Sequence, residues 1–115
     1  MHATQLFKAL SDPTRLRCLS LLINENELCV CELTHALDLP QPKVSHHLAA
    51  LRKAELVTDS KAGLWIYYRL NPKLPHWISE VIQTATDGIK GEEPYASDLL
   101  ALAEMPNRPG GICSA

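Results

Sequence analysis

The apolar residues in the first part of the chain recur every three or four positions, which is the period of an α-helix. This pattern predicts a short first helix and a longer second helix within "SDPTRLRCLSLLI", residues 11–23. Asp12 can cap the second helix, Pro13 suits its first turn, and the polar segment "NENE" ends it. The apolar positions of the two helices are Leu6, Phe7, Leu10, Leu16, Leu19, Leu22 and Ile23.

Two further helices are predicted next, and a tight turn joins them. The segment "VCELTHAL" (residues 30–37) forms the shorter one, which "DLP" stops. The segment "QPKVSHHLAALRKAEL" (residues 41–56) forms the other, which begins at Gln41 or Pro42 and buries Val44, Leu48 and Leu51. Two short helices joined by a tight turn, with basic residues on the second, are typical of a helix-turn-helix.

The period of the apolar residues changes to two after the fourth helix, which indicates β-strands. The segments "LVTDS" (residues 56–60) and "LWIYYRL" (residues 64–70), joined by a turn at "KAG", predict a β-hairpin, or wing. The two faces of the second strand carry Leu64, Ile66, Tyr68 and Leu70 on one side and Trp65, Tyr67 and Arg69 on the other. We expect the aromatic residues to pack within the wing.

Two helices are predicted beyond the chain breaks at Pro72 and Pro75. The first, "HWISEVIQTATDGI", has a long apolar face in which we expect Trp77 to join a dimer core, and the second lies in "ASDLLALAEM". The fold class is therefore mainly α with a β-hairpin wing, a winged helix-turn-helix, and the apolar face of the helix at residues 76–89 is expected to form a homodimer. Residues 1–105 are expected to form one DNA-binding and dimerisation domain, and residues 106–115 a flexible C-terminal tail.

The composition is that of a globular protein. The chain has 115 residues, of which 46% are hydrophobic and 21% are charged. No apolar run approaches the roughly 20 residues of a membrane span, and the N-terminus lacks the features of an export signal. We therefore expect a cytoplasmic protein with no membrane partner. Its four cysteines, which should be reduced there and available for thiol or metal chemistry, are Cys18, Cys29, Cys31 and Cys113.

The distribution of charge indicates a nucleic-acid partner, although the net charge is only -2. Residues 41–70 contain five Lys and Arg residues against two Asp and Glu residues, and the segments on both sides are acidic. A basic centre in an acidic chain is expected where one face meets phosphate. On charge alone, a chance fluctuation of surface composition explains the pattern equally well.

Cys29 and Cys31 stand at the predicted start of the third helix. Free N–H groups and the positive end of the helix dipole favour thiolates there, and thiolates bind soft centres such as trivalent arsenic and antimony. On a regular helix, residues two apart point about 200° away from each other, whereas in extended backbone they share a face. One atom can therefore bridge both sulfurs only if the helix start is non-helical or unwinds.

The order of the elements and three stretches of sequence resemble the ArsR/SmtB family of winged-helix repressors. The stretches are "LFKALSDPTRLRCLSLL", "ELCVCELTHAL" with "QPKVSHHLAALRKAELV", and "GLWIYYRL". The Cys-Val-Cys motif is similar to one known in the arsenic-responsive branch. The resemblance implies a homodimeric repressor of an arsenic resistance operon. It would leave double-stranded operator DNA when arsenite, As(III), or antimonite, Sb(III), binds Cys29 and Cys31, and no organic cofactor is implied.

The recognition helix of such a protein should place its N-terminal part in the major groove. The side chains expected to contact DNA there are Gln41, Lys43, Ser45, His46 and His47. For His47, packing between helices is an equal alternative. Arg52 is expected to anchor phosphate, while Lys61 at the wing tip and Arg69 on its strand are expected to meet the DNA backbone.

Two positions depart from the family pattern. Many relatives have Arg where this chain has His46, whose neutral imidazole is a weaker anchor for DNA. Some relatives carry a third cysteine where this chain has Thr34. Because trivalent arsenic prefers three sulfurs, the candidates for the third position are a small ligand such as water, Cys18, and Cys113. Cys113 is favoured, since a tail ending "GGICSA" can reach the site.

Other interpretations of the thiols remain open. Within DNA binding, they fit a sensor of cadmium or lead, or of thiol oxidation or persulfides. A small thiol oxidoreductase is disfavoured because no Cys-X-X-Cys precedes a helix in a βαβ pattern, so we expect no enzyme activity. A cytoplasmic metal carrier has no use for a basic helix-turn-helix. Zinc sensing is disfavoured because His76, Glu80 and Asp87 lack the paired spacing of zinc-sensing relatives.

Overall fold

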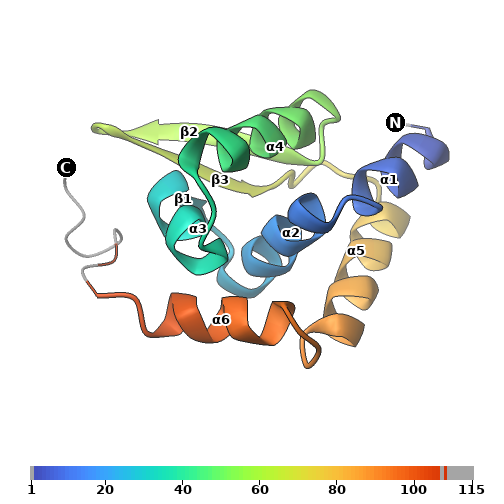
Figure 1. The fold of residues 1–115 in the computed structure, drawn as a ribbon. Coiled ribbons are helices and arrows are strands. Elements are labelled where there is room, and N and C mark those ends of the chain that lie inside the picture. Colours follow the sequence, from blue (N-terminus) through green and yellow to red (C-terminus); the bar gives the residue numbers. More distant parts are fainter. Residues whose placement is uncertain (1, 107, 109–115) are drawn as a thin grey trace.

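The structure, a computed structural model, describes residues 2–106 and 108 of the chain. Helix α2 runs through the middle of the molecule, with α4 and the wing on one side of it and α6 on the other (Figure 1). The elements confirm the expected class of a mainly helical fold with a β-hairpin wing. No helix in these residues is long and apolar enough to cross a membrane. The elements are α1 (Ala3–Leu10), α2 (Pro13–Glu25), β1 (Leu28–Cys29), α3 (Val30–Leu37), α4 (Gln41–Lys53), β2 (Val57–Ala62), β3 (Trp65–Leu70), α5 (His76–Ile89) and α6 (Tyr95–Ala103).

Helix α2 begins where the sequence provides a cap. Asp12 accepts a hydrogen bond from the backbone N–H of Arg15 at 2.9 Å, and Pro13 occupies the first turn, as predicted. The helix continues two residues past the predicted end and stops at Glu25, because Asn26 adopts a positive φ of 69°. The side chains that α2 buries completely, or to within 1% exposure, are Cys18, Leu19, Leu21 and Leu22.

The helix-turn-helix consists of α3 and α4, which pack against each other. Helix α3 spans the predicted residues, and Asp38 ends it in the left-handed region with φ 53°. Helix α4 ends at Lys53, three residues before the predicted end, because Glu55 adopts a φ of 63° that no helix continues. The side chains of α4 that are fully buried are the predicted ones, Val44, Leu48 and Leu51.

The wing belongs to a three-stranded antiparallel sheet with the order β1-β3-β2. The sequence does not predict β1, because a strand of two residues shows no period. In this strand Leu28 pairs with Tyr68 and Cys29 pairs with Tyr67. The two strands of the hairpin meet at Gly63, the last residue of the predicted turn, and glycine accepts the φ of 64° that this position requires.

The face of the wing that carries Leu64, Ile66 and Tyr68 is buried only at its base. Tyr68 is 9% exposed, whereas Ile66 is 44% exposed and Leu64 is 79% exposed. The strand predicted from this alternation is present, and the outer half of its apolar face is exposed. The reason is that the hairpin extends beyond the helices that would cover it (Figure 1).

Helix α5 buries only one side of its apolar face. Ile78 and Ile82 are fully buried, while Trp77 is 46% exposed. On the outer side of the same helix, Val81 and Ala85 border an open hollow. This surface is available to a second copy of the chain, so the place of Trp77 in a dimer core stays a prediction.

A buried ion pair holds α6 against the rest of the molecule. Arg17 of α2 donates through Nε to Oδ2 of Asp98 at 2.8 Å and through Nη2 to Oδ1 at 2.7 Å. The same Nη2 donates to the carbonyl oxygen of Leu37, at the end of α3, at 3.0 Å. The hydrogen bond to Asp98, whose side chain is only 5% exposed, raises the pKa of Arg17 above its ordinary value. One guanidinium group thus joins α2, α3 and α6.

Candidate functional site

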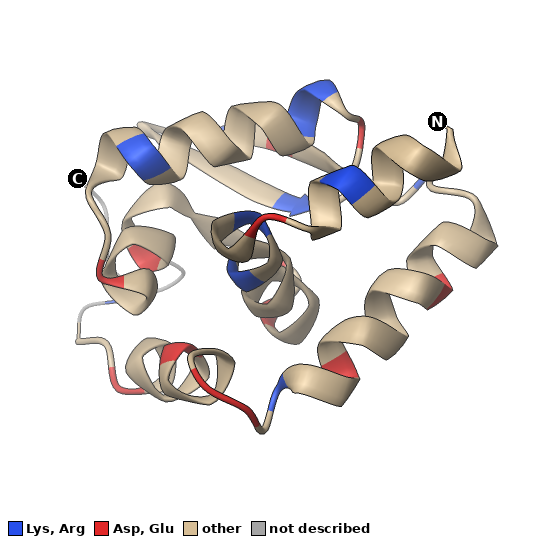
Figure 2. Cartoon of the chain, turned by 45° about the vertical axis from the view of Figure 1, so that its right-hand side comes forward, with Lys and Arg blue, Asp and Glu red and all other residues tan. Residues whose placement is uncertain are grey.

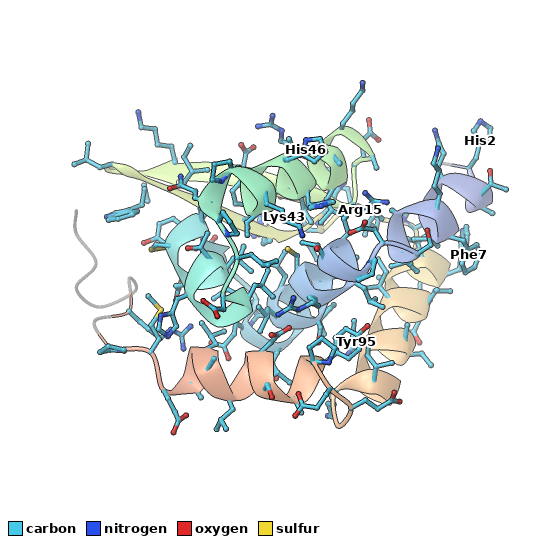
Figure 3. All side chains as sticks on the ribbon, in the orientation of Figure 1. His2, Phe7, Arg15, Lys43, His46 and Tyr95 are labelled. Atoms are coloured by element: carbon cyan, nitrogen blue, oxygen red, sulfur yellow. A yellow bond between two sulfur atoms is a disulfide. The ribbon has the colours of Figure 1, made fainter. Side chains whose placement is uncertain are left out.

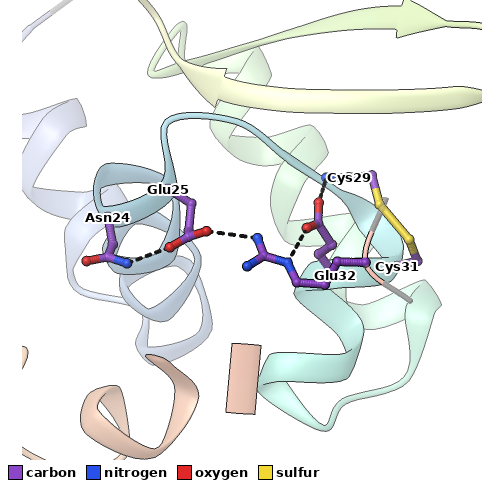
Figure 4. A network of polar contacts seen from close by, with 6 residues as sticks. Asn24, Glu25, Cys29, Cys31 and Glu32 are labelled. Atoms are coloured by element: carbon purple, nitrogen blue, oxygen red, sulfur yellow. Dashed lines mark hydrogen bonds and ion pairs between the residues drawn. A yellow bond between two sulfur atoms is a disulfide. The ribbon is translucent and has the colours of Figure 1, made fainter. Parts of the chain in front are cut away.

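Cys29 and Cys31 lie where β1 ends and α3 begins. Cys29 is the N-cap residue in extended backbone, with φ −87° and ψ 165°, and Cys31 lies in the first turn of α3. A disulfide joins them, with 5.5 Å between their Cα atoms (Figure 4). Cys29 is fully buried and Cys31 is half-buried. The two sulfurs therefore meet beside a helix that starts regularly at Val30.

The structure bears on two expectations about these thiols, and it corrects the first. The sequence predicts reduced cysteines, whereas the structure joins them. One atom can bridge both sulfurs if the start of the helix is non-helical or if the helix unwinds. The structure has the non-helical start. Cys29 is extended because it pairs with Tyr67 of β3, and residues two apart share a face in extended backbone. Helix α3 needs no unwinding to bring the sulfurs together.

An acidic side chain connects the thiol pair to the C-terminal segment. Glu32 accepts through Oε1 from the backbone N–H of Cys29 at 3.0 Å and through Oε2 from Nε of Arg108 at 2.8 Å. Arg108 also donates through Nη2 to Oε1 of Glu25, at the end of α2, at 2.8 Å (Figure 4). The Glu32 side chain is 5% exposed, so water does not solvate its carboxylate. The positive charge of Arg108 compensates the negative charge of this carboxylate instead.

Sequence reasoning missed both Glu32 and Arg108. Glu32 stands three residues after the N-cap, which is the spacing of a capping box and a signal that the sequence does contain. Arg108 has no such local signal, because its partners lie more than 70 residues away along the chain.

The other two cysteines differ in their availability. Cys18 is fully buried in α2, and burial raises the pKa of its thiol to about 12. It therefore stays protonated at neutral pH and is a poor ligand for a metalloid. Cys113 lies outside the described residues. Within residues 2–106 and 108, no group of three or more His, Cys, Asp or Glu side chains is placed to hold a metal ion.

A hollow of about 270 Å³ lies against Cys31, which we call the Cys31 hollow. Val30 and Thr34 of α3 line it together with Gln41, the first residue of α4. The indole nitrogen of Trp65 is buried and has no hydrogen-bond partner within the described part of the chain. The hairpin closes the other side with Leu64, Trp65 and Ile66. Cys31 therefore lies where α3, α4 and the wing meet.

Helix α4 presents several of the predicted DNA contacts. Gln41, Lys43 and His46 are exposed, and Ser45 is half-buried. His46 lies on the outer edge of α4 (Figure 3). Lys and Arg positions mark both ends of α4, whereas acidic positions mark α5 and α6 (Figure 2). The surface formed by α4 and the wing is therefore the side suited to phosphate.

The remaining predicted basic contacts lie on or beside the wing. Lys61, near the end of β2, and Arg69 of β3 are exposed. Arg52 of α4 donates through Nη1 to Oδ2 of Asp59 in β2 at 2.9 Å and is 52% exposed. Arg52 thus ties α4 to the wing and keeps half of its surface open to a phosphate.

His47 contacts the start of α2. Its side chain is 13% exposed, and its Nδ1 lies 3.6 Å from Oδ2 of Asp12. Burial lowers the pKa of His47 below its ordinary value and outweighs the attraction of Asp12, while the positive charges of Arg15 and Lys43 and the ring of His46 lower it further. The folded protein therefore favours the neutral imidazole.

The pH dependence of folding should report the burial of His47. Because its pKa is lower in the folded protein, the unfolded chain takes up the proton first as the pH falls through about 6.5. Stability is therefore intact above that pH and is lost below it. We expect His47→Gln to lose less of its free energy of unfolding than the parent between about pH 7.5 and about pH 5.5, measured by urea unfolding. Equal losses in the two proteins would contradict this.

Comparison with known proteins identifies the family. Residues 12–59 match the family model described as bacterial regulatory protein, arsR family. The chain is 49% identical over 104 residues to the arsenic resistance transcriptional regulator ArsR1 of Pseudomonas putida. The aligned region covers 90% of this chain and 80% of the relative. The chain belongs to the arsR family. This ArsR-family protein is also 52% identical over 81 residues to the arsenical resistance operon repressor of Escherichia coli, over 70% of this chain and 69% of the relative.

Solved structures agree with the family. HlyU from Vibrio cholerae superimposes with a TM-score of 0.68 and 33% identity, over 76% of this chain and 90% of that chain. The family match runs from the N-cap of α2 into β2 and so includes the thiol pair and all of α4. This ArsR-family protein is therefore a winged helix-turn-helix transcriptional regulator that binds DNA.

Proposed function

We propose that this ArsR-family protein is a metalloid-responsive transcriptional repressor. It acts in the cytoplasm and binds double-stranded operator DNA as a homodimer, and arsenite or antimonite releases it by binding the thiolates of Cys29 and Cys31. The observation that carries the proposal is the meeting of the two sulfurs at the first turn of α3, the helix that packs on α4. The names of the relatives from Pseudomonas putida and Escherichia coli, which refer to arsenic, support the same inducer.

Reduction of the disulfide precedes binding of the metalloid. A cellular dithiol reduces the Cys29–Cys31 bond and is itself oxidised, which leaves two thiols on a backbone that already brings them together. Arsenite then exchanges two hydroxyl groups for the two sulfurs and releases two waters, and arsenic stays trivalent. The positive end of the α3 dipole favours the thiolates that this exchange uses.

The thiol pair adjoins both parts of the DNA-binding face. Cys29 is paired with Tyr67 in the wing strand β3, and Cys31 borders the same hollow as Gln41 at the start of α4. A metalloid between the sulfurs changes their spacing, so the wing and the start of α4 both adjust. A coupling free energy of about 1 to 3 kcal/mol weakens DNA binding by about 5- to 150-fold, which relieves repression where operator occupancy is marginal.

The proposed DNA contacts are those of the basic face. Gln41, Ser45 and His46 are proposed to read base edges in the major groove, and Lys43 to anchor phosphate. His47 has its contact with Asp12 as an alternative to a DNA contact. The proposed backbone contacts beside the groove are Arg52, Lys61 and Arg69.

Salt dependence tests the role of Lys43. We expect Lys43→Gln to reduce the slope of the dimer's log affinity against log salt concentration by about 1.8, because each of the two protomers loses one phosphate contact and its released counterion. The matched control is Lys90→Gln, an exposed lysine after α5 that lies 3.8 Å from Asp87. The control should keep the parental slope. An unchanged slope for Lys43→Gln would remove Lys43 from the interface.

Cys113 is proposed as the third ligand for arsenite. Support comes from Arg108, which is anchored to Glu32 beside the thiol pair and precedes Cys113 by five residues. Five residues of extended chain span up to about 17 Å, which is the reach that Cys113 has from Arg108. We expect Cys113→Ser to raise the arsenite concentration for half-release by about tenfold in an anisotropy titration. An unchanged value would assign the third position to a small ligand instead.

The proposed function is tested by fluorescence anisotropy on labelled duplex from the region upstream of the protein's own gene. The protein is kept reduced with a phosphine, and arsenite is titrated at fixed salt because phosphate contacts dominate affinity. We expect a complex without arsenite and release with it. Failure to bind the duplex would contradict the repressor function, and binding without release would exclude arsenite as the inducer.

A second candidate signal is thiol oxidation, which the Cys29–Cys31 disulfide favours. In this case the disulfide itself, formed when an oxidant takes two electrons and two protons from the thiols, is the released state. The same duplex is titrated with oxidised protein in the absence of arsenite. Weak binding that a phosphine restores would support the oxidation sensor, and equal binding of both forms would exclude it.

A further inference from the structure

The tip of the wing carries the most exposed large apolar side chain in the described part of the chain. Leu64 is 79% exposed, and Ile66, two residues further along, is 44% exposed. Ala62 pairs with Trp65 across the hairpin, so the turn between the strands consists of Gly63 and Leu64 alone. A two-residue turn favours glycine, asparagine, aspartate or serine. The geometry of the turn therefore explains Gly63, but it does not explain a leucine at the next position.

The charge at the wing tip is suited to a polyanion. Lys61 pairs with Ile66 across the hairpin, so an exposed cation and an exposed apolar side chain lie side by side. Residues 60–67 contain one lysine and no acidic residue. The acid next to this segment, Asp59, accepts a hydrogen bond from Arg52 at 2.9 Å, so its negative charge is compensated. An apolar end with a positive charge beside it is suited to contact with nucleic acid.

The position of α4 decides which part of the DNA the wing tip meets. Leu64 and Gln41, the first residue of α4, border the same hollow, so the tip lies beside the start of this helix. The major and minor grooves of DNA alternate, and one sugar-phosphate backbone separates them. When α4 occupies the major groove, a hairpin beside the start of α4 crosses one backbone and meets the adjacent minor groove.

The dimensions of the wing tip fit this groove. Leu64 lies four residues before Tyr68, the buried base of the wing, which is about 13 Å along a strand, and the hairpin extends beyond the helices here (Figure 1). The minor groove is about 7.5 Å deep and about 6 Å wide. A single side chain at the turn fits that width, whereas two paired strands about 4.8 Å apart with their side chains do not. Leu64 is therefore the part of the wing that can enter.

We propose that Leu64 is an apolar wedge that enters the minor groove next to the major groove bound by α4 and inserts between two stacked base pairs. The proposal rests on the DNA-binding part of the proposed function and adds to it a contact that reads the deformability of the DNA. Apolar wedges unstack one base step and bend the duplex by about 20 to 90° toward the major groove. The steps that open most easily are TA and CA/TG, so the wedge selects such a step outside the bases that α4 contacts.

DNA bending and thymine reactivity test the wedge. The phosphine-reduced full chain is bound at saturation to the duplex from the region upstream of its own gene. Energy transfer between dyes on the two duplex ends measures the bend, and permanganate, which oxidises unstacked thymines, marks the opened step. We expect a bend of about 40° or more, because each of the two wings of a dimer contributes a kink of at least about 20°, and a reactive thymine in each half-site. A straight duplex without reactive thymines would overturn the proposal.

Three variants assign the bend to Leu64. Leu64→Ser removes the wedge, Leu64→Met keeps a large apolar side chain, and Leu100→Ser is the matched control at a 59% exposed position of α6. We expect Leu64→Ser to lose at least about half of the bend and about tenfold in thymine reactivity, and the other two variants to keep both within about twofold. The high exposure of Leu64 means that its replacement leaves the fold intact. A parental bend in Leu64→Ser would overturn the proposal.

Other outcomes separate the wedge from the proposed function and from a different occupant of the wing tip. If arsenite releases a duplex that was bound without a bend, the wedge fails and the proposed function stands. If the reduced protein does not bind the duplex, both fail. If the DNA-free protein forms assemblies larger than a dimer in sedimentation, and Leu64→Ser abolishes them, the tip binds a second copy of the chain and the wedge is overturned.

Discussion

Replacement of Cys29 or Cys31 by serine is expected to leave DNA binding in place and to raise the arsenite concentration for half-release by about 100- to 10,000-fold. In the proposed site two sulfurs on one short segment chelate the metalloid, and a single thiol lacks the effective concentration of the second. Serine suits the N-cap position of Cys29, and Glu32 keeps its hydrogen bond to the backbone N–H there. Anisotropy titration at one fixed salt concentration measures the shift.

Cys18→Ala is the control for this prediction. Cys18 is fully buried with its thiol pKa raised to about 12, so we expect it to take no part in metalloid binding. Its loss should lower the free energy of unfolding by about 1 kcal/mol through a small cavity and leave half-release within about twofold of the parent. Parental release by Cys29→Ser and Cys31→Ser would rule out the thiol pair as the site.

Asp98→Ala is expected to lower the free energy of unfolding by about 3 to 5 kcal/mol. The change leaves the Arg17 guanidinium without its two hydrogen bonds from 2.7 to 2.8 Å, in a position where its side chain is only 18% exposed. The melting temperature should fall by at least about 10 °C. Urea unfolding and thermal unfolding both measure the effect.

Two further variants test whether the loss of stability in Asp98→Ala comes from the buried, unpaired charge of Arg17. Asp87→Asn on α5 removes an acid that is 56% exposed and lies 3.8 Å from Lys90, and it should change stability by less than about 0.5 kcal/mol. The double change Arg17→Met with Asp98→Leu replaces both charges by apolar groups and should be more stable than Asp98→Ala alone, since no charge stays buried. A double variant as unstable as Asp98→Ala would mean that packing, not charge, explains the loss.

Stability and response share one part of the molecule. Arg17 fixes the end of α3 through the Leu37 carbonyl, and Glu32 holds its beginning through the Cys29 N–H. Helix α3 is thus held at both ends, and under the proposed function a change at the thiols passes through it to α4 and the wing. Asp98→Ala, studied at a temperature where it is folded, should therefore also reduce the coupling between arsenite and DNA.

Much of the fold follows from local patterns in the sequence. Helices α3 and α4, the wing and the capping of α2 by Asp12 are predicted because apolar period, caps and turn residues act over a few neighbouring positions. The same local reasoning locates the thiol pair at the start of α3. The end of α4 is predicted less well. A positive φ is usually recognised in a sequence by a glycine, and here the residue with the positive φ is Glu55.

The sequence by itself determined the order of the elements, the basic helix-turn-helix and the spacing of two thiols two residues apart, since these depend on residues close together in the chain. The tertiary structure alone decided what surrounds them. It extended Cys29 by pairing it with Tyr67, brought Arg108 to Glu32 and Arg17 to Asp98, and set the wing against Cys31 to form a hollow. These contacts join segments that are distant in sequence, and they form because packing of the whole core brings those segments together, which no local pattern specifies.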